Sequence, residues 1–177
     1  MARRHAGLFC VQTKTETKTV KARAVTNFAS QFGVNLSLNP ELVVEKNGRF
    51  YFVNEALKPL LVRKDFFYAG VFLGKAKEGK FFPSFNLLSM LAQRGAHRIV
   101  VERKAAWLFI CGRPILAQSV LQVFGSGKKN MHVLVLNEFG ECLGFGRIVG
   151  NLNVKGGMDE VAVRNVSDVG DFLRRER

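Results

Sequence analysis

From His97 onward the chain is a series of short apolar runs separated by turn residues, a pattern typical of a small β-barrel. Gly112 ends one apolar run as a helix C-cap would, and Asp168 is a good helix-capping residue. The expected strands are 97–101, 115–123, 132–136, 142–149 and 161–166, and the expected helices are 105–110 and 168–175. This part of the chain is therefore expected to form one small β-rich domain.

The residues before Gly95 mix helices with hairpins and predict a separate α/β domain. Asn47-Gly48 lies between two strand-like runs and favours the left-handed backbone angles of a tight hairpin turn. The expected elements are a helix at 13–32 ended by Gly33, strands at 42–46 and 49–53, a short helix at 54–62, a second hairpin at 66–82 with its turn at 74–80, and a helix at 84–95 with Leu87, Leu88 and Leu91 on one face. The fold class predicted is α+β, with domains 1–95 and 96–177.

The charge of the chain points to a polyanionic partner. The sequence has 27 Lys and Arg against 14 Asp and Glu, a formal net charge of +13. Such an excess raises the rate of encounter with polyanions, and nucleic acid is favoured over an acidic membrane surface. No apolar run approaches the length of a membrane-spanning helix. The basic faces of the 13–32 helix fit a solvated surface and an auxiliary RNA contact equally well.

The sequence contains no residue pattern that indicates catalysis. The three cysteines are odd in number and widely spaced, which predicts buried thiols in a reducing compartment and no zinc site or disulfide framework. The three histidines have no paired Cys, Ser or carboxylate at an informative spacing. The glycines at 144, 146 and 150 do not match the spacing of a dinucleotide-binding loop. We therefore expect a non-enzymatic binding protein with no cofactor and no metal.

Several segments of the chain resemble the PUA family, named for pseudouridine synthase and archaeosine transglycosylase. In the carboxy-terminal part they are Gly112-Arg113-Pro114-Ile115-Leu116, His132-Val133-Leu134-Val135-Leu136, Leu143-Gly144-Phe145-Gly146 and the closing run 168–174. With the upstream runs 51–55 and 69–81, the chain resembles an archaeal-type member of the Nip-seven family of ribosome-biogenesis factors. The resemblance implies an antiparallel α/β pre-PUA domain followed by a PUA pseudo-barrel that binds single-stranded, often uridine-rich RNA.

The resemblance also implies that the RNA contacts lie on the PUA domain, including the segment after the Gly-Phe-Gly strand. Arg147 follows Gly146, which has no side chain to block the approach of a nucleotide. Arginine, lysine and side-chain amides are expected to contact phosphates, ribose hydroxyls and base edges. The candidate RNA-binding residues are Arg113, Gln118, Ser119, Lys128, Lys129, Arg147, Asn151, Asn153 and Lys155. Trp107, the only tryptophan, is interpreted as a core anchor, with stacking on a base as the alternative.

The function expected on these grounds is that of an RNA-binding adaptor in large ribosomal subunit biogenesis and pre-rRNA processing. Its partners would be pre-rRNA or another single-stranded RNA and ribosome-assembly proteins, with no membrane. The protein would be a cytoplasmic monomer, or nucleolar in a eukaryote. Three alternatives remain: the targeting subunit of an RNA-modifying enzyme, a PUA-type translation factor, and a protein-interaction scaffold with a degenerate RNA site.

Overall fold

The computed structural model describes residues 22–61, 65–150, 152 and 160–171, and these residues form two compact units. The first unit contains the described residues up to Phe28 together with Leu36–Asn86. The second contains Ala29–Asn35 and the described residues from Leu87 onward. Compactness does not define an independently folding domain, so the division into domains 1–95 and 96–177 stays a prediction.

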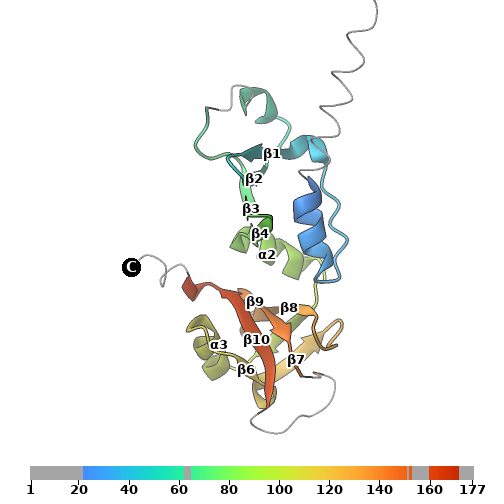
Figure 1. The fold of residues 1–177 in the computed structure, drawn as a ribbon, viewed down its shortest axis with the longest axis vertical. Coiled ribbons are helices and arrows are strands. Elements are labelled where there is room, and N and C mark those ends of the chain that lie inside the picture. Colours follow the sequence, from blue (N-terminus) through green and yellow to red (C-terminus); the bar gives the residue numbers. More distant parts are fainter. Residues whose placement is uncertain (1–21, 62–64, 151, 153–159, 172–177) are drawn as a thin grey trace, which may run out of the picture. The chain divides into compact units, whose positions relative to one another are not determined.

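The first unit contains a four-stranded antiparallel sheet in the order β1 (Val43–Lys46), β2 (Arg49–Phe52), β3 (Val71–Lys77) and β4 (Lys80–Pro83). Two 3-10 helices accompany it, η1 (Pro40–Leu42) and η2 (Lys58–Leu61). Asn47 and Gly48 join β1 to β2 with φ angles of 51° and 72°, which are the angles of a tight primed turn. The Asn47-Gly48 hairpin is therefore confirmed (Figure 1).

The second hairpin exists, but its predicted limits are wrong. Its turn is the pair Glu78-Gly79, with φ angles of 52° and 73°, so β3 continues to Lys77 instead of ending at Leu73. Residues 66–70 lie outside the strand, because Gly70 turns the backbone with a φ of 59°. The helix expected at 54–62 is reduced to η2, although the Asn54 side chain does accept a hydrogen bond from the Leu57 N–H at 2.9 Å.

The second unit is built on a six-stranded sheet in the order β6 (Ile115–Leu116), β10 (Val161–Asp168), β9 (Cys142–Ile148), β8 (His132–Leu136), β5 (Arg98–Val101) and β7 (Val120–Phe124). Only the β5–β8 pair of this sheet is parallel. The expected strand 115–123 is wrong at its centre, where a 3-10 turn, η3 (Ala117–Ser119), separates β6 from β7 and sends the two strands to opposite edges of the sheet.

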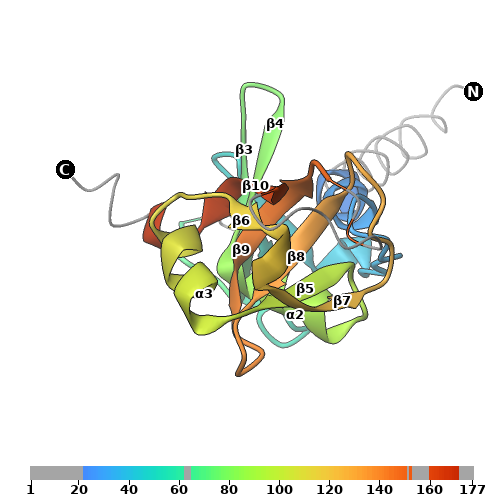
Figure 2. The same cartoon turned by 90° about the horizontal axis from the view of Figure 1, so that it is seen from below.

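One face of this sheet packs against α3 (Arg103–Ile110), which lies beside β6, β9 and β10 (Figure 2). The core between them is apolar and includes Ile99, Phe109, Val133, Ile148 and Val163, each 1 % exposed or less. Side chains alternate across a strand, so the residues next to Ile148 and Val163 along their strands need not face this core. This alternation gives β9 and β10 their exposed arginines.

The remaining helices also follow the sequence pattern. Residues 22–30 are helical, and Gly33 has the positive φ of 75° expected of a C-cap, while residues 13–21 of the predicted helix lie outside the described residues. The helix α2 (Phe85–Gln93) buries Leu87, Leu88 and Leu91 as expected. The chain therefore has the predicted α+β fold, with an antiparallel sheet followed by a mixed, barrel-like one. No helix in the described part of the chain is long and apolar enough to cross a membrane.

Candidate nucleic-acid interface

A row of three cationic or titratable side chains crosses the middle of the second sheet. In the strand register, Arg147 on β9 is paired with His132 on β8 and with Arg164 on β10. Arg147 and Arg164 are exposed, and His132 is half-buried. Within the described residues, no hydrogen bond or ion pair engages the side chain of either arginine. The register thus brings together two arginine side chains that are 17 positions apart in the sequence.

The opposition of two positive charges lowers the stability of the protein when no ligand is bound. Like charges directly opposite each other on antiparallel strands are destabilising, and cross-strand pairs contribute on the order of 0.2–1 kcal/mol. A bound anion would remove that cost, because a guanidinium group forms paired hydrogen bonds with phosphate oxygens. The Arg147–Arg164 pair is therefore suited to hold a phosphate.

His132 adds a neutral aromatic end to the row. Its ring packs against Phe32, at a centroid distance of 5.8 Å, and against Phe145, at 5.9 Å. Burial lowers the pKa of His132 below its ordinary value of 6.5, and the nearby positive charge of Arg147 lowers it further. His132 is consequently neutral at pH 7, and the two arginines supply the charge of the row.

Arg164 also lines a pocket of about 340 Å³ at one edge of the sheet. The other lining residues are Gly112, Pro114, Val149, Val161 and Asn165. The side-chain nitrogen of Asn165 donates hydrogen bonds to the Phe109 carbonyl at 2.7 Å and to an Asp168 carboxylate oxygen at 3.0 Å. Two acceptors on one side fix the amide orientation, so the Asn165 Oδ1 is held in a defined direction. The pocket is an open surface hollow whose lining combines apolar side chains with the polar residues Arg164 and Asn165.

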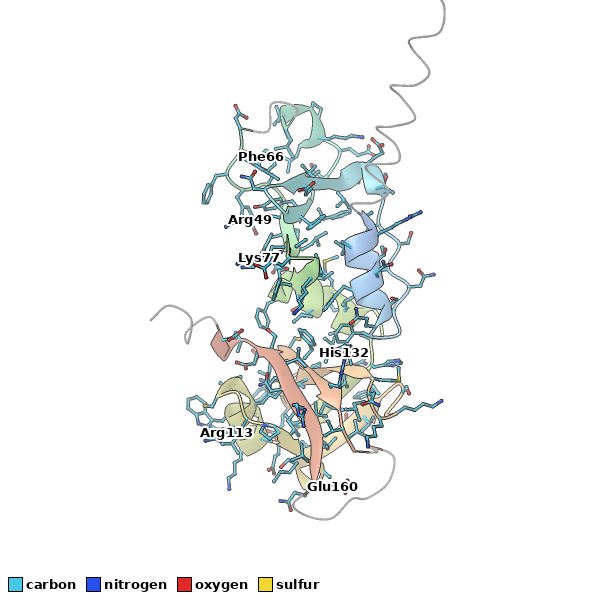
Figure 3. All side chains as sticks on the ribbon, viewed as in Figure 1. Arg49, Phe66, Lys77, Arg113, His132 and Glu160 are labelled. Atoms are coloured by element: carbon cyan, nitrogen blue, oxygen red, sulfur yellow. The ribbon has the colours of Figure 1, made fainter. Side chains whose placement is uncertain are left out.

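The predicted residue Arg113 lies between two of the residues that line this pocket. The N–H of Gly112 donates to the Phe109 carbonyl at 2.9 Å, and the N–H of Arg113 donates to the Leu108 carbonyl at 3.0 Å. Together with the φ of 85° at Gly112, these bonds form a Schellman cap at the end of α3. The cap fixes the backbone of Arg113 and leaves its side chain exposed beside α3 (Figure 3).

The loop that carries Lys128 and Lys129 is attached to the end of β9. The Asn130 N–H donates to the Ile148 carbonyl at 2.7 Å, next to Arg147 in the sequence. Both lysine side chains are exposed. The structure therefore places this basic loop at the same end of β9 as the arginine row.

The two polar candidates in η3 differ in accessibility. Gln118 is exposed. Ser119 is buried, and its hydroxyl donates a hydrogen bond to a Glu102 carboxylate oxygen at 2.9 Å. The Ser119 hydroxyl is thus used inside the domain. Three further candidates, Asn151, Asn153 and Lys155, lie outside the described residues.

Two interpretations made from the sequence are wrong. Gly146 does not open the surface to a nucleotide: it is buried, and a Cβ there would lie 2.6 Å from the Arg164 carbonyl oxygen, so the close approach of β10 requires the glycine. Trp107 is not a core anchor, since its side chain is 65 % exposed on α3.

Three members of the site were not predicted from the sequence: Arg164, His132 and Asn165. Arg164 could have been noticed in the sequence, because it is the one charged residue in the largely apolar run 161–166.

The cysteines occupy unlike environments. Burial raises the pKa of the Cys142 thiol to about 11, with a smaller opposing effect from a backbone hydrogen bond with Gly144. Cys111 is exposed, so the expectation of a buried thiol is wrong at this position. Cys10 lies outside the described residues. In the part of the chain that the structure describes, no group of three or more His, Cys, Asp or Glu is placed to hold a metal ion.

Comparisons with known proteins agree with the fold of the second unit. Residues 97–177 match the family model described as the UPF0113 PUA domain. A UPF0113 protein of Archaeoglobus fulgidus is 26 % identical over 167 residues, which cover 92 % of this chain and 95 % of that protein.

Two solved archaeal structures share the fold over most of the chain. A conserved PUA domain protein from Thermoplasma acidophilum has a TM-score of 0.57 at 18 % identity, and a hypothetical protein from Pyrococcus horikoshii has a TM-score of 0.58 at 17 % identity. Each comparison covers 90 % of this chain and 95 % of the other. These two structures therefore show that the chain has the fold of a PUA domain protein.

Proposed function

We propose that this protein binds single-stranded RNA through its PUA domain and performs no chemistry on it. The observation that carries the proposal is the pair of exposed arginines, Arg147 and Arg164, opposed across β9 and β10 beside a pocket. Arg113, whose backbone lies between two pocket residues, adds a third exposed arginine, and Lys128 and Lys129 extend the positive charge along the end of β9. Phosphates of the RNA would bind the guanidinium groups of the arginines, and the pocket is large enough to receive a base or a sugar.

Single-stranded RNA suits this surface better than a duplex. The pocket edge contains one fixed side-chain amide, Asn165, which can read the edge of a base only when that base is unpaired. The net charge of +13 supports the electrostatic part of the binding. Within this class of ligand we propose a preference for uridine-rich RNA, on the basis of the resemblance to the Nip-seven family.

The biological setting that we propose is the processing of large-subunit pre-rRNA in the cytoplasm, with the protein acting as an adaptor for other assembly factors. The first unit offers a surface for such partners, because three large apolar side chains are exposed there: Leu60 at 73 %, Phe67 at 86 % and Tyr68 at 55 %. Crosslinking in cells tests this setting. Recovery of large-subunit precursors supports it, and recovery of mature small subunits supports a translation factor instead.

The binding site is tested by a titration of fluorescently labelled oligouridylate at several salt concentrations. The double variant Arg147→Ala/Arg164→Ala is expected to bind more weakly. For single strands, the slope of log K against log salt changes by about 0.7 for each neutralised phosphate that is lost, so the slope should flatten by about 0.7 where the pair holds one phosphate and by about 1.4 where each arginine holds its own.

The matched control is Lys77→Ala/Lys80→Ala, which removes the same number of charges from the exposed hairpin of the first unit. An effect confined to the arginine variant supports the proposed site. Equal effects of the two variants would show that only the overall charge matters, and an unchanged affinity in the arginine variant would remove this row from the site. An oligoadenylate of the same length tests the preference for uridine.

A further inference from the structure

The outward face of α3 combines a large aromatic surface with positive charge. Its side chains at spacings of three and four are exposed, namely Arg103, Lys104, Trp107 and Leu108. The opposite face, with Ala105 and Phe109, is buried in the core of the PUA domain. Trp107 is 65 % exposed, and among the described residues no aromatic ring or cation packs against it. An exposed tryptophan of this kind needs an explanation outside the fold.

The first turn of α3, which precedes Trp107, carries only positive charge. Arg103 and Lys104 precede it by four and three residues, and no acidic residue lies in the first turn of α3. The nearest negative charge in the sequence is Glu102, which lies just before the helix, and its carboxylate is hydrogen-bonded to the Ser119 hydroxyl at 2.9 Å. Cations in the first turn of a helix are unfavourable to the helix itself, because the macrodipole is positive there. The two cations are thus not explained by helix stability, and they complement a polyanion.

The face also leads toward the proposed RNA site. Cys111 lies one turn after Trp107, about 6 Å along the helix axis, and is exposed like it. Gly112 follows at once and lines the pocket, with Arg113 beside it. A strand of RNA that occupies the pocket can therefore continue over this face without crossing an acidic surface of α3.

We propose that Trp107 is a stacking platform for an unpaired base of the bound RNA, with Arg103 and Lys104 holding the adjacent phosphates. The inference rests on the proposed RNA-binding function and names a second contact for the same ligand. Aromatic side chains stack on any base and add about 1–3 kcal/mol per base, which makes them common in proteins that bind single strands. The charge argues for RNA over a protein partner at this face.

Phe139 provides a contrasting exposed aromatic in the same unit. It is 84 % exposed at the turn between β8 and β9, but its neighbours in the turn include Glu138 and Glu141. An acidic surrounding repels phosphates, so this ring is not expected to contact RNA. The Phe139→Ala variant is therefore a matched control for the loss of an exposed aromatic ring.

The test uses the full chain and a labelled oligouridylate, with two signals recorded in one titration. Label anisotropy reports binding, and the intrinsic fluorescence reports Trp107 alone, because the chain has one tryptophan. We expect the fluorescence to be quenched with the same midpoint as the anisotropy change. Trp107→Ala should weaken binding by between about 5-fold and about 140-fold. Trp107→Phe, which keeps a ring, should recover most of the affinity, and Phe139→Ala should have no effect.

The salt dependence separates this proposal from the phosphate site. Stacking is not an ionic contact, so Trp107→Ala should leave the slope of log K against log salt unchanged, whereas Arg147→Ala/Arg164→Ala should flatten it. Binding without quenching, and with full affinity in Trp107→Ala, would overturn the stacking platform and leave the arginine site intact. Quenching of Trp107 on binding, together with a slope of log K against log salt that Arg147→Ala/Arg164→Ala leaves unchanged, would support the stacking platform and overturn the arginine site. An absence of any RNA binding would overturn both proposals.

Discussion

Replacing one of the two opposed arginines is expected to change the stability of the fold and the affinity for RNA in opposite directions. Arg164→Met keeps an unbranched side chain on β10 and removes the positive charge that faces Arg147. If Arg164 is kept for a ligand, its replacement should stabilise the folded protein and weaken RNA binding. If Arg164 has a structural role, its replacement should destabilise the fold.

The size of the stabilisation follows from the register. Cross-strand partners have Cβ atoms about 5 Å apart, and two unit charges held at that distance in water would repel each other by about 0.8 kcal/mol, which is the upper limit for exposed arginine side chains that can move their guanidinium groups apart. For a chain of this length, about 0.8 kcal/mol corresponds to a rise in Tm of about 2–3 °C. The loss of a charge-assisted hydrogen bond costs about 1.5–3 kcal/mol of binding, or a weakening of roughly 10- to 150-fold.

Thermal unfolding at low and high salt, together with an oligouridylate titration, measures both effects. The gain in Tm should shrink at about 1 M salt, where the screening length is about 3 Å. Arg98→Met is the matched control on β5: its guanidinium lies 4.5 Å from the centre of the Phe124 ring, so this variant should destabilise the fold. A fall in Tm for Arg164→Met with unchanged RNA affinity would refute the reasoning.

Three further predictions concern single residues. Gly144→Ala should destabilise the protein by about 3 kcal/mol in chemical denaturation, because its φ of 146° suits only glycine and a Cβ would collide with the β10 backbone; Gly140→Ala, where a Cβ meets no atom within 4 Å, should cost clearly less. The stability that neutral His132 contributes should be complete above pH 6.5 and decline as the pH falls toward its lowered folded pKa, since the unfolded chain takes up the proton first; His132→Phe should lose this part of the pH dependence of unfolding. Iodoacetamide at pH 8 should modify Cys111 and spare Cys142, whose pKa of about 11 leaves roughly one thiolate in a thousand, and equal labelling in peptide mass spectrometry would contradict this.

The fold was largely predictable because its local signals are strong. Asn47-Gly48 specifies its turn type, and the apolar runs of β5, β8, β9 and β10 each indicate a strand. The limits of an element were predicted wrongly where the sequence carried no local signal or where the signal fitted two structures. Glu78-Gly79 forms the same kind of turn as Asn47-Gly48. The glycines and lysines around it fit several turn positions, so the sequence did not indicate which two residues form the turn.

The site was less predictable than the fold because it depends on register. Arg147 lies on β9 and Arg164 on β10, and these strands are connected by the 12 residues from Val149 to Glu160. Only the pairing of β9 with β10 places the two arginines opposite each other. Trp107 was misread for a different reason. Residues 105–110 are all apolar, so their spacing does not say which face of α3 is buried, and the structure buries the Ala105–Phe109 face.

Three features of the PUA domain are each unfavourable in the isolated fold. Arg147 faces Arg164 across two strands, two cations stand in the first turn of α3, and a tryptophan is exposed on the same helix. A sequence that is consistent at every level would avoid all three, and local violations of this kind concentrate at functional sites. Phosphates would relieve the first two, and a stacked base would cover the third. A flexible polyanion with aromatic groups satisfies all three at once, and single-stranded RNA has that chemistry.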